Sequence, residues 1–408
     1  MSALWTPRNH HRRLVLAPKA PEILSLPYLR KVLAIAGRAN IGLWPQSETS
    51  GTVAYDLSGR GHHGAYTGVR FTVPGAEIFG NPGFETAGGG GADVFGTWAE
   101  SALGTGGAIA DEAVDVYAGA HAAKLTAASD VNVSLYQNAA VVPWAQYALA
   151  FQAHGDGTKA PFYKVTDVTN TGDIIANTTT GITGTAYQRT LTSFAAPGGC
   201  VSARPILYLP SNGGIAYFDD ASLVAAAPNG PISGLTAPYF DGVSAFTNIY
   251  SAALAAAFNG ARGTLLTWAR VGSAGVWTDG AARNIITIGN GNDIIAIRRT
   301  TNNGEMRLAH FAGATLRAVD YTTSSPTGWV PYALTWSVSA NAVKAYMLGA
   351  QIGAVAGPAA WGIAPVSTLM VIGAASTVPA SVYSGLIGLT LLCDRDLSPA
   401  EIAALSVA

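Results

Sequence analysis

The sequence predicts an all-β protein made of two antiparallel β-sandwiches, one inserted into the other, behind an irregular N-terminal arm. Short runs of alternating apolar and polar residues recur along the chain, which is the pattern of half-buried strands. The 48 glycines suit the many tight turns that such strands need, and only 12% of the residues are charged. Few stretches carry apolar residues at a 3.6-residue period, so helix should be minor.

Residues 1–37 form a basic, proline-rich arm. Regular structure is interrupted there by four prolines: Pro7, Pro18, Pro21 and Pro27. The stretch from Tyr28 to Ala36 could form one short helix. Up to Arg38, seven basic residues and one acidic residue give this head a net charge of +6. It is either a flexible leader or an anchor that packs onto another protein. A basic head could bind nucleic acid, but protein contact or solvation is commoner, so no nucleic-acid partner is expected.

The sequence also bears on the cellular location of the protein. No apolar run reaches membrane-spanning length, so no membrane span is expected. The run from Leu14 to Ala17 is too short for a signal-peptide core and is followed by Pro18. Cys200 and Cys393 are interpreted as separate buried or free thiols. A glycan-binding chain without a secretion signal can still reach the outside by cell lysis, as a component of a virus particle.

Residues 76–230 form a compositional unit of their own. Alternation predicts strands at 122–125, 131–136, 147–153, 162–168, 187–194 and 206–209. Strands at this spacing, with turn signals between them, indicate a sandwich or barrel. A linker follows, marked by Pro228, Gly230, Pro231 and Gly234.

The flanking segments, 38–75 and 234–408, are again rich in strand patterns. The clearest predicted strands are 263–271, 285–288, 294–299, 306–310, 332–337, 342–348, 368–372 and 384–393. Near the end, Ser398, Pro399 and Glu401 have the spacing of a helix start, with serine as N-cap, proline in the first turn and glutamate at the third position.

Two pieces of these flanking segments carry motifs of a known family. The first piece has Leu43-Trp44-Pro45, Ser50-Gly51-Thr52 and a glycine-rich loop from Asp56 to Gly64. The second has Tyr239-Phe240-Asp241-Gly242, Thr267-Trp268, Leu334-Thr335-Trp336 and Leu397-Ser398 before Glu401-Ile402. Together they resemble laminin-G-like, concanavalin-A-like sandwiches, and the resemblance makes Trp268 and Trp336 core residues.

The distance between the two pieces points to an insertion. Family members usually separate them by a short segment, whereas residues 69–238, the length of a whole domain, intervene here. Insertions succeed at exposed loop tips whose ends lie close together. We therefore expect a discontinuous host sandwich, 38–75 plus 234–408, with a guest at 76–230.

The guest carries a second set of motifs: Asn81-Pro82-Gly83-Phe84-Glu85, Trp98, Tyr147-Ala148-Leu149 and Phe218-Asp219-Asp220. They resemble the jelly-roll carbohydrate-binding modules attached to xylanases. That resemblance implies a structural calcium near the opening and closing strands, at Asn81, Glu85 and Asp220. In the host, Asp56 and Asp241 could serve similarly. The alternative is that these carboxylates only hydrogen-bond turns.

Aromatic residues are the remaining candidates for binding. Sugar rings stack on flat aromatic faces, and their hydroxyls need amide or carboxylate partners. The candidate residues of the guest are Trp98, Tyr136, Gln137, Trp144, Tyr163 and Tyr208. Each aromatic ring could instead belong to the core.

A catalytic site is not expected. Sandwich glycosidases need two closely spaced carboxylates, and no such run occurs. Asp219 and Asp220 are adjacent, so on a regular strand they face opposite sides.

We expect a non-enzymatic virion protein on a phage exterior (tail fibre, tail tip or capsid decoration), docked on other virion proteins through residues 1–37. Its sandwiches would touch a cell-surface glycan, and a homo-oligomer is possible. The alternatives are a stand-alone carbohydrate-binding protein and a glycoside hydrolase.

Overall fold

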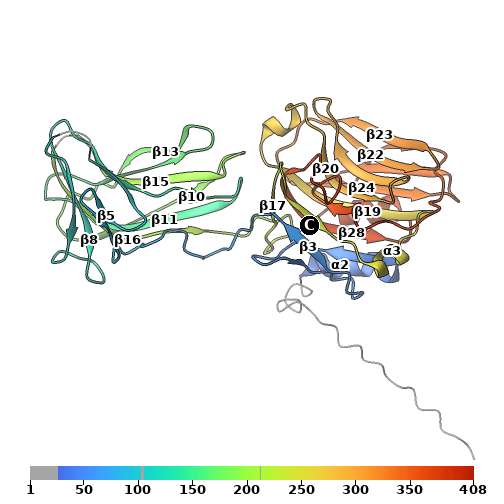
Figure 1. Ribbon diagram of the computed structural model, residues 1–408, viewed down its shortest axis with the longest axis horizontal. Helices are drawn as coiled ribbons and strands as arrows, with labels where there is room; N and C mark the ends of the chain where they lie inside the picture. Colours follow the sequence, from blue (N-terminus) through green and yellow to red (C-terminus); the bar gives the residue numbers. More distant parts are fainter. Residues whose placement is uncertain (1–25, 103–104, 212) are drawn as a thin grey trace, which may run out of the picture.

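The computed structural model describes residues 26–408, with the exception of 103, 104 and 212, and it is an all-β molecule (Figure 1). The strands fall into two units that lie side by side in Figure 1. Strands β4 to β16, between Ala87 and Ala225, make one unit, for which we keep the name guest. Strands β1 to β3 and β17 to β28, within 40–67 and 239–393, make the other, the host.

The host is built from two antiparallel sheets. The β19 sheet has the order β1 (Asn40–Trp44), β28 (Ser384–Cys393), β19 (Arg262–Val271), β24 (Val330–Ser337), β25 (Ala342–Met347) and β26 (Ala350–Val355), with β17 (Tyr239–Asp241) also paired to β28. The β20 sheet has the order β2 (Val53–Ala54), β3 (Gly64–Thr67), β18 (Phe246–Asn248), β27 (Met370–Ile372), β20 (Arg283–Gly289), β21 (Ile294–Arg299), β22 (Glu305–Ala312) and β23 (Thr315–Thr322). Strands before the guest pair with strands after it in both sheets, since β1 pairs with β28 and β3 with β18.

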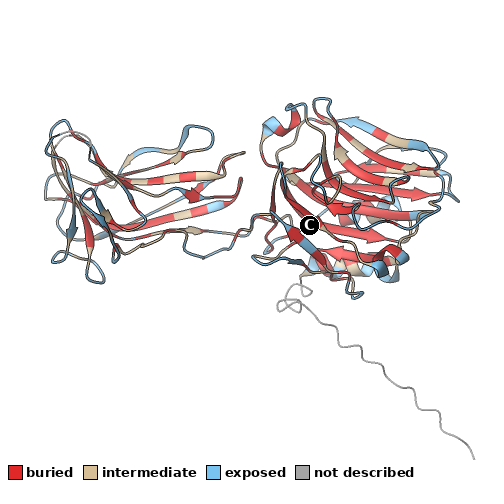
Figure 2. Cartoon of the chain, in the orientation of Figure 1, coloured by how far each residue is buried: buried red, intermediate tan, exposed pale blue. Residues whose placement is uncertain are grey.

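The host core lies between its two sheets. Trp44, Phe240 and Trp336 are fully buried there, as alternation along the strands directs every second side chain inward. Trp268 is also buried, but on the opposite face of the β19 sheet, in a second apolar cluster. The prediction that Trp268 and Trp336 are core residues is therefore confirmed. Figure 2 shows buried residues along the strands of both units and exposed residues at the loops.

Helices cover the outer face of the β19 sheet. Helix α2 (Pro27–Ala36) begins with proline, whose missing N–H is tolerated at that position, and ends at Gly37, which has φ 55°. Its Leu29 and Val32 are buried in the same cluster as Trp268. Short elements elsewhere are η1 (Gly37–Ala39), α3 (Ala252–Ala257) and η2 (Ala274–Trp277). Within the described part of the chain, no helix is long and apolar enough to cross a membrane.

The N-terminal and C-terminal helices are joined by specific contacts. The Tyr28 hydroxyl donates to the Leu405 carbonyl of α4 (Pro399–Leu405), and the Trp268 indole donates to the Tyr28 oxygen at 3.0 Å. Residues 27–36 therefore belong to the host and are not a separate arm, which corrects the boundary drawn at residue 37. Residues 1–25, with most of the predicted anchor, lie outside the described residues. The predicted start of α4 is confirmed, because Ser398 and Glu401 form a capping box.

The guest is also a pair of antiparallel sheets. The β15 sheet has the order β13 (Gly172–Thr179), β12 (Phe162–Asp167), β15 (Ser202–Leu209), β9 (Val133–Tyr136) and β6 (Ala99–Ala102), with β10 (Ala139–Ala140) also paired to β15. The β11 sheet has the order β14 (Gln188–Ala195), β11 (Gln146–His154), β16 (Gly214–Ala225), β8 (Ala122–Ala127) and β7 (Ala108–Glu112). A separate ribbon pairs β4 (Ala87–Gly90) with β5 (Asp93–Phe95).

A direct contact joins guest and host. The Trp144 indole donates to the Val271 carbonyl at 2.8 Å, and the Arg270 guanidinium carbon lies 4.6 Å from the indole centroid. Nearby, the Gly199 N–H donates to the Gly272 carbonyl at 2.7 Å. The guest therefore docks on the end of β19 as well as being connected through the chain.

Candidate functional site

The outer face of the β15 sheet presents a row of aromatic and polar side chains. Along β12 and β15 the buried positions alternate with half-buried ones. Tyr163 and Leu207 point into the guest core, so Phe162 and Tyr208 point outward. On β9 the same alternation turns Tyr136 outward beside the buried Leu135. Three strands thus bring their aromatic side chains to one solvent-facing surface.

Cross-strand register sets the spacing of these rings. Phe162 and Tyr208 are direct partners, with ring centroids 5.6 Å apart and planes tilted by 49°. Tyr136 lies diagonally across from Tyr208, since it pairs with Ile206. The Arg204 guanidinium lies 4.6 Å from the Tyr136 centroid and covers one side of that ring. Arg204 is held in place because its Nε donates to Asn138 Oδ1 at 2.7 Å.

Charged groups flank the aromatic row. Lys164 lies on the same face of β12 and pairs with Ile206. Two residues further along β12, Thr166 donates to Asp173 of β13 at 3.3 Å. Partial burial, and then the Asp173 charge, raise the pKa of Tyr208, so its hydroxyl stays protonated. The surface therefore combines apolar ring faces with hydrogen-bond donors and acceptors, which is the chemistry that a sugar requires. We call Phe162, Tyr208, Tyr136, Arg204 and Asn138 the aromatic face.

The predicted sugar-binding residues do not all reach this face. Tyr136 and Tyr208 lie on it. Gln137 lies at its edge, where its amide both accepts from the Gly80 N–H at 3.1 Å and donates to the Gly80 carbonyl at 2.6 Å. Trp144 lies at the contact with the host, where its indole N–H is already engaged. The prediction that Trp144 offers a ring to a sugar is corrected accordingly.

Trp98 and Tyr163 are core residues. Trp98 is 4% exposed, stacks on Phe84 at 5.0 Å, and donates from its indole to the Asn81 carbonyl at 2.9 Å. Tyr163 is 9% exposed and packs edge-on against Phe151. Neither ring presents a face to solvent, so both predictions are corrected. Phe162, directly next to Tyr163 in sequence, takes the outward position because alternation allows only one of the two to face out.

A second aromatic group on the β11 sheet was missed from the sequence. His154 at the end of β11 is buried, and its ring stacks on Tyr217 with centroids 4.3 Å apart. Tyr187 approaches the same ring edge-on at 4.5 Å, and Tyr117 is half exposed beside Tyr187. Tyr117 comes from a loop, which carries no alternation to signal it, and Tyr187 directly precedes β14, at the first residue of the strand predicted at 187–194. The side of the sheet on which His154 lies could have been predicted from alternation along β11. It is two residues beyond Gln152, on the face opposite Phe151.

Two of the three residues predicted near a guest calcium, Asn81 and Glu85, hydrogen-bond the backbone. Asn81 Oδ1 accepts from the Thr86 N–H, and its amide nitrogen donates to the Thr86 and Gly96 carbonyls. Glu85 accepts from the Ala120 and His121 N–H groups. Asp220 is exposed and has φ 48° at a bulge in β16.

The two host carboxylates behave in the same way. Asp56 accepts from the backbone N–H groups of Leu43, Ser58 and His62. Asp241 accepts from Val243, Ser244 and Ala245. Partial burial raises the pKa of its carboxyl, but together these hydrogen bonds outweigh burial and lower it. In the described part of the chain, no three His, Cys, Asp or Glu side chains gather as a metal site. Calcium binding stays a prediction.

The adjacent pair Asp219 and Asp220 is separated in space by the bulge. Asp219 is fully buried and accepts from the Tyr117 and Ala118 N–H groups, and burial raises the pKa of its carboxyl. Asp220 is exposed on the other side. Asp219 thus anchors the loop that carries Tyr117, and the two carboxylates do not face a common substrate.

Comparison with known proteins gives partial matches. No protein-family model and no curated protein matches the sequence. The carbohydrate-binding module TmCBM61, solved in complex with β-1,4-galactotriose, is 18% identical over 37% of this chain and 99% of the module, with a TM-score of 0.29. The CBM40 module of Ruminococcus gnavus IT-sialidase is 17% identical over 38% and 87%, with a TM-score of 0.33. The enzymatically active domain of bacteriophage CBA120 tailspike protein 4 is 13% identical over 36% and 21%, with a TM-score of 0.29. None of these likenesses assigns a function to this chain.

Proposed function

We propose that this chain is a non-enzymatic glycan-binding protein of a phage exterior and that the aromatic face of the guest is its sugar-binding surface. The observation that carries the proposal is the pairing of Phe162 with Tyr208 on an open face beside Tyr136 and Arg204. The two adjacent rings supply the apolar surface for a sugar ring, and the Arg204–Asn138 pair supplies donors and acceptors for its hydroxyls.

Glycan arrays with the full chain and with Tyr208→Ala test the surface. Losing one stacking ring is expected to weaken binding by about tenfold, which corresponds to about 1.4 kcal/mol. Leu191→Ala is the matched control, because Leu191 is 60% exposed on the other sheet of the guest. Equal binding by Tyr208→Ala and wild type would move the site elsewhere, and loss of binding by Tyr117→Ala would place it at the His154 group. No binding to any glycan would reject the lectin proposal.

The virion assignment is tested separately. Immunogold electron microscopy of purified particles, with antibody against residues 76–230, should label a fixed position on the particle. That position would distinguish a tail fibre or tail tip from a capsid decoration. Clean particles without label would reject the assignment and favour a stand-alone carbohydrate-binding protein. Release of reducing sugar from a bound polysaccharide would overturn the non-enzymatic assignment.

A structural calcium is proposed for the guest on resemblance alone, near Asn81, Glu85 and Asp220. The ion would bind the Glu85 carboxylate, which also accepts hydrogen bonds from the Ala120 and His121 N–H groups. Thermal unfolding after dialysis against EDTA, with and without added calcium, tests it. Identical curves would remove calcium from the proposal.

A further inference from the structure

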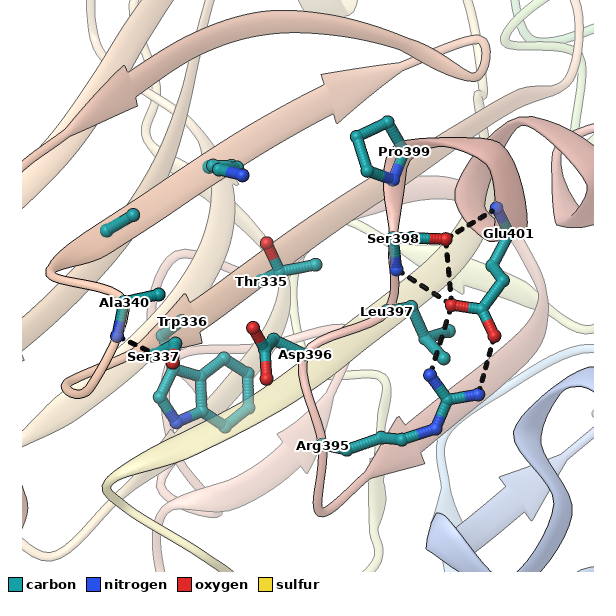
Figure 3. Close-up of a pocket in the computed structure, with 12 residues that line it drawn as sticks. Thr335, Trp336, Ser337, Ala340, Arg395, Asp396, Leu397, Ser398, Pro399 and Glu401 are labelled. Atoms are coloured by element: carbon teal, nitrogen blue, oxygen red, sulfur yellow. Dashed lines mark hydrogen bonds and ion pairs between the residues drawn. The ribbon is translucent and has the colours of Figure 1, made fainter.

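The host contains a cavity with a volume of about 410 Å³ between the outer face of the β19 sheet and the segment that leads into α4. One wall comes from β24 and β25 and carries Thr335, Ser337 and Lys344. The other wall is the segment with Arg395, Asp396 and Glu401. Figure 3 shows these two walls facing each other. The cavity lies in the host, so it is separate from the aromatic face of the guest.

The second wall is held rigidly. Arg395 makes two hydrogen bonds to the Glu401 carboxylate, at 3.0 and 2.7 Å, and a third to the Ile35 carbonyl. The Leu397 N–H donates to Thr264 Oγ1 at 2.8 Å, which ties the segment to β19. The hydrogen bonds to Arg395 lower the pKa of Glu401 to about 2, so this pair stays charged and mutually satisfied. Neither partner is free to bind a ligand.

Two further charges in the cavity have no such partner. Among the described residues, neither Lys344 nor Asp396 makes a side-chain hydrogen bond or an ion pair. Lys344 is half-buried and lies across the strands from Thr335, while Asp396 is on the opposite wall. In Figure 3 the Asp396 carboxylate points away from the Arg395–Glu401 pair and toward the strand that carries Thr335. The cavity thus offers one unpaired ammonium and one unpaired carboxylate.

The lining favours charge recognition over sugar stacking. Trp336 contributes to the lining, but its side chain is 1% exposed and packs beside Phe258 in the host core. No aromatic face is therefore offered by this tryptophan. Ala342, which pairs with Ser337 across the strands, contributes only a methyl group to the lining. Asp396 is exposed and Lys344 is half-buried, so both charges reach solvent, and a ligand that carries both opposite charges gains a charge-assisted hydrogen bond at each wall.

We propose that this cavity binds a small zwitterion, with the ligand carboxylate on Lys344 and the ligand ammonium on Asp396. A free amino acid is the simplest ligand of this class. The proposal does not depend on glycan binding by the guest, since the two surfaces share no residue.

Ligand-observed saturation-transfer NMR on the full chain tests the proposal. The probes are L-serine, N-acetylserine, which lacks the ammonium, and serinamide, which lacks the carboxylate. L-serine should bind saturably, and each half-ligand at least about tenfold more weakly, because each loses one charge-assisted hydrogen bond. Equal binding of the three probes, or no saturation by serine at millimolar concentrations, would overturn the proposal.

Substitutions then assign each end of the ligand. Lys344→Gln should abolish the preference for serine over serinamide, and Asp396→Asn the preference for serine over N-acetylserine. Asp394→Asn is the matched control beside the cavity and should bind as wild type. Ala342→Leu keeps both charges but fills the space, so it should weaken all three probes. The assignment would be contradicted if both charge variants kept the preference of the wild type for serine over serinamide and N-acetylserine while unfolding at the same temperature. Stronger binding of a neutral hexose than of serine would also contradict it.

Discussion

At the scale of single residues, His310 is a histidine enclosed by aromatic rings of the host. It is fully buried, with its ring centroid 6.3 Å from Trp336 and 6.5 Å from Trp361. Burial lowers the pKa of His310 from 6.5, more than Gly260 and Asp293 raise it. Below pH 6.5 the unfolded chain binds a proton that the folded chain resists, so the free energy of unfolding should fall as the pH falls.

Urea unfolding of wild type and His310→Leu between about pH 5 and pH 8 measures this contribution. The variant should lose part of the decline below pH 6.5 and keep the plateau above it. Burial also lowers the pKa of His62, which is present in both proteins, so only the difference between the two curves belongs to His310. Parallel curves would show that His310 does not titrate differently in the folded state.

Gly119 is a second residue whose identity the fold requires. It has φ +69°, and a Cβ there would lie 1.9 Å from Glu85 Oε1. Gly119→Ala should therefore destabilise the protein by about 1–3 kcal/mol, through backbone strain and loss of the Glu85 hydrogen bonds. Gly181→Ala is the control, because Gly181 has φ +73° and no atom of the described chain within 4 Å of its Cβ position. Chemical unfolding measures the loss of unfolding free energy in each variant. Equal losses in Gly119→Ala and Gly181→Ala would assign the whole effect to backbone strain.

At the scale of elements, helix α2 stabilises the host although it precedes the first strand. Leu29 is fully buried in the cluster beneath α2 and α4. Leu29→Ala should cost about 2–5 kcal/mol, as for other buried leucines. The neighbouring Arg30 is exposed, so Arg30→Ala should change the free energy of unfolding by less than about 0.5 kcal/mol. Similar unfolding midpoints for the two variants would mean that α2 is not part of the folded host.

Strand prediction succeeded where alternation was strong and missed an edge strand that has no buried residue. The predicted strands at 206–209 and 162–168 correspond to β15 and β12, whose burial alternates residue by residue. Strand β13, at the edge of the same sheet, has no fully buried residue and was not predicted. An edge strand contributes little to a core, so selection for apolar alternation is weak there.

At the scale of the whole molecule, the contact at Trp144 fixes the guest on the host. Trp144→Ala removes the hydrogen bond to Val271 and the contact with Arg270. The variant should weaken docking by roughly 2 kcal/mol, less than a fully buried tryptophan would cost. Small-angle X-ray scattering should then give a larger radius of gyration than for wild type. Tyr117→Ala, on an exposed loop of the guest, should leave scattering unchanged, and equal profiles for all three proteins would show that docking does not depend on Trp144.

The sequence by itself determined the all-β class, about half of the strands and the start of α4, because strand period and capping depend on residues close together in the chain. The tertiary structure decided which aromatic residues are available for binding. Phe162 and Tyr163 are adjacent and equally suited to either face, and only packing against Phe151 directs Tyr163 inward. Likewise, Trp144 became a contact with the host because β19 ends beside it, a proximity of residues 127 positions apart that no local pattern encodes.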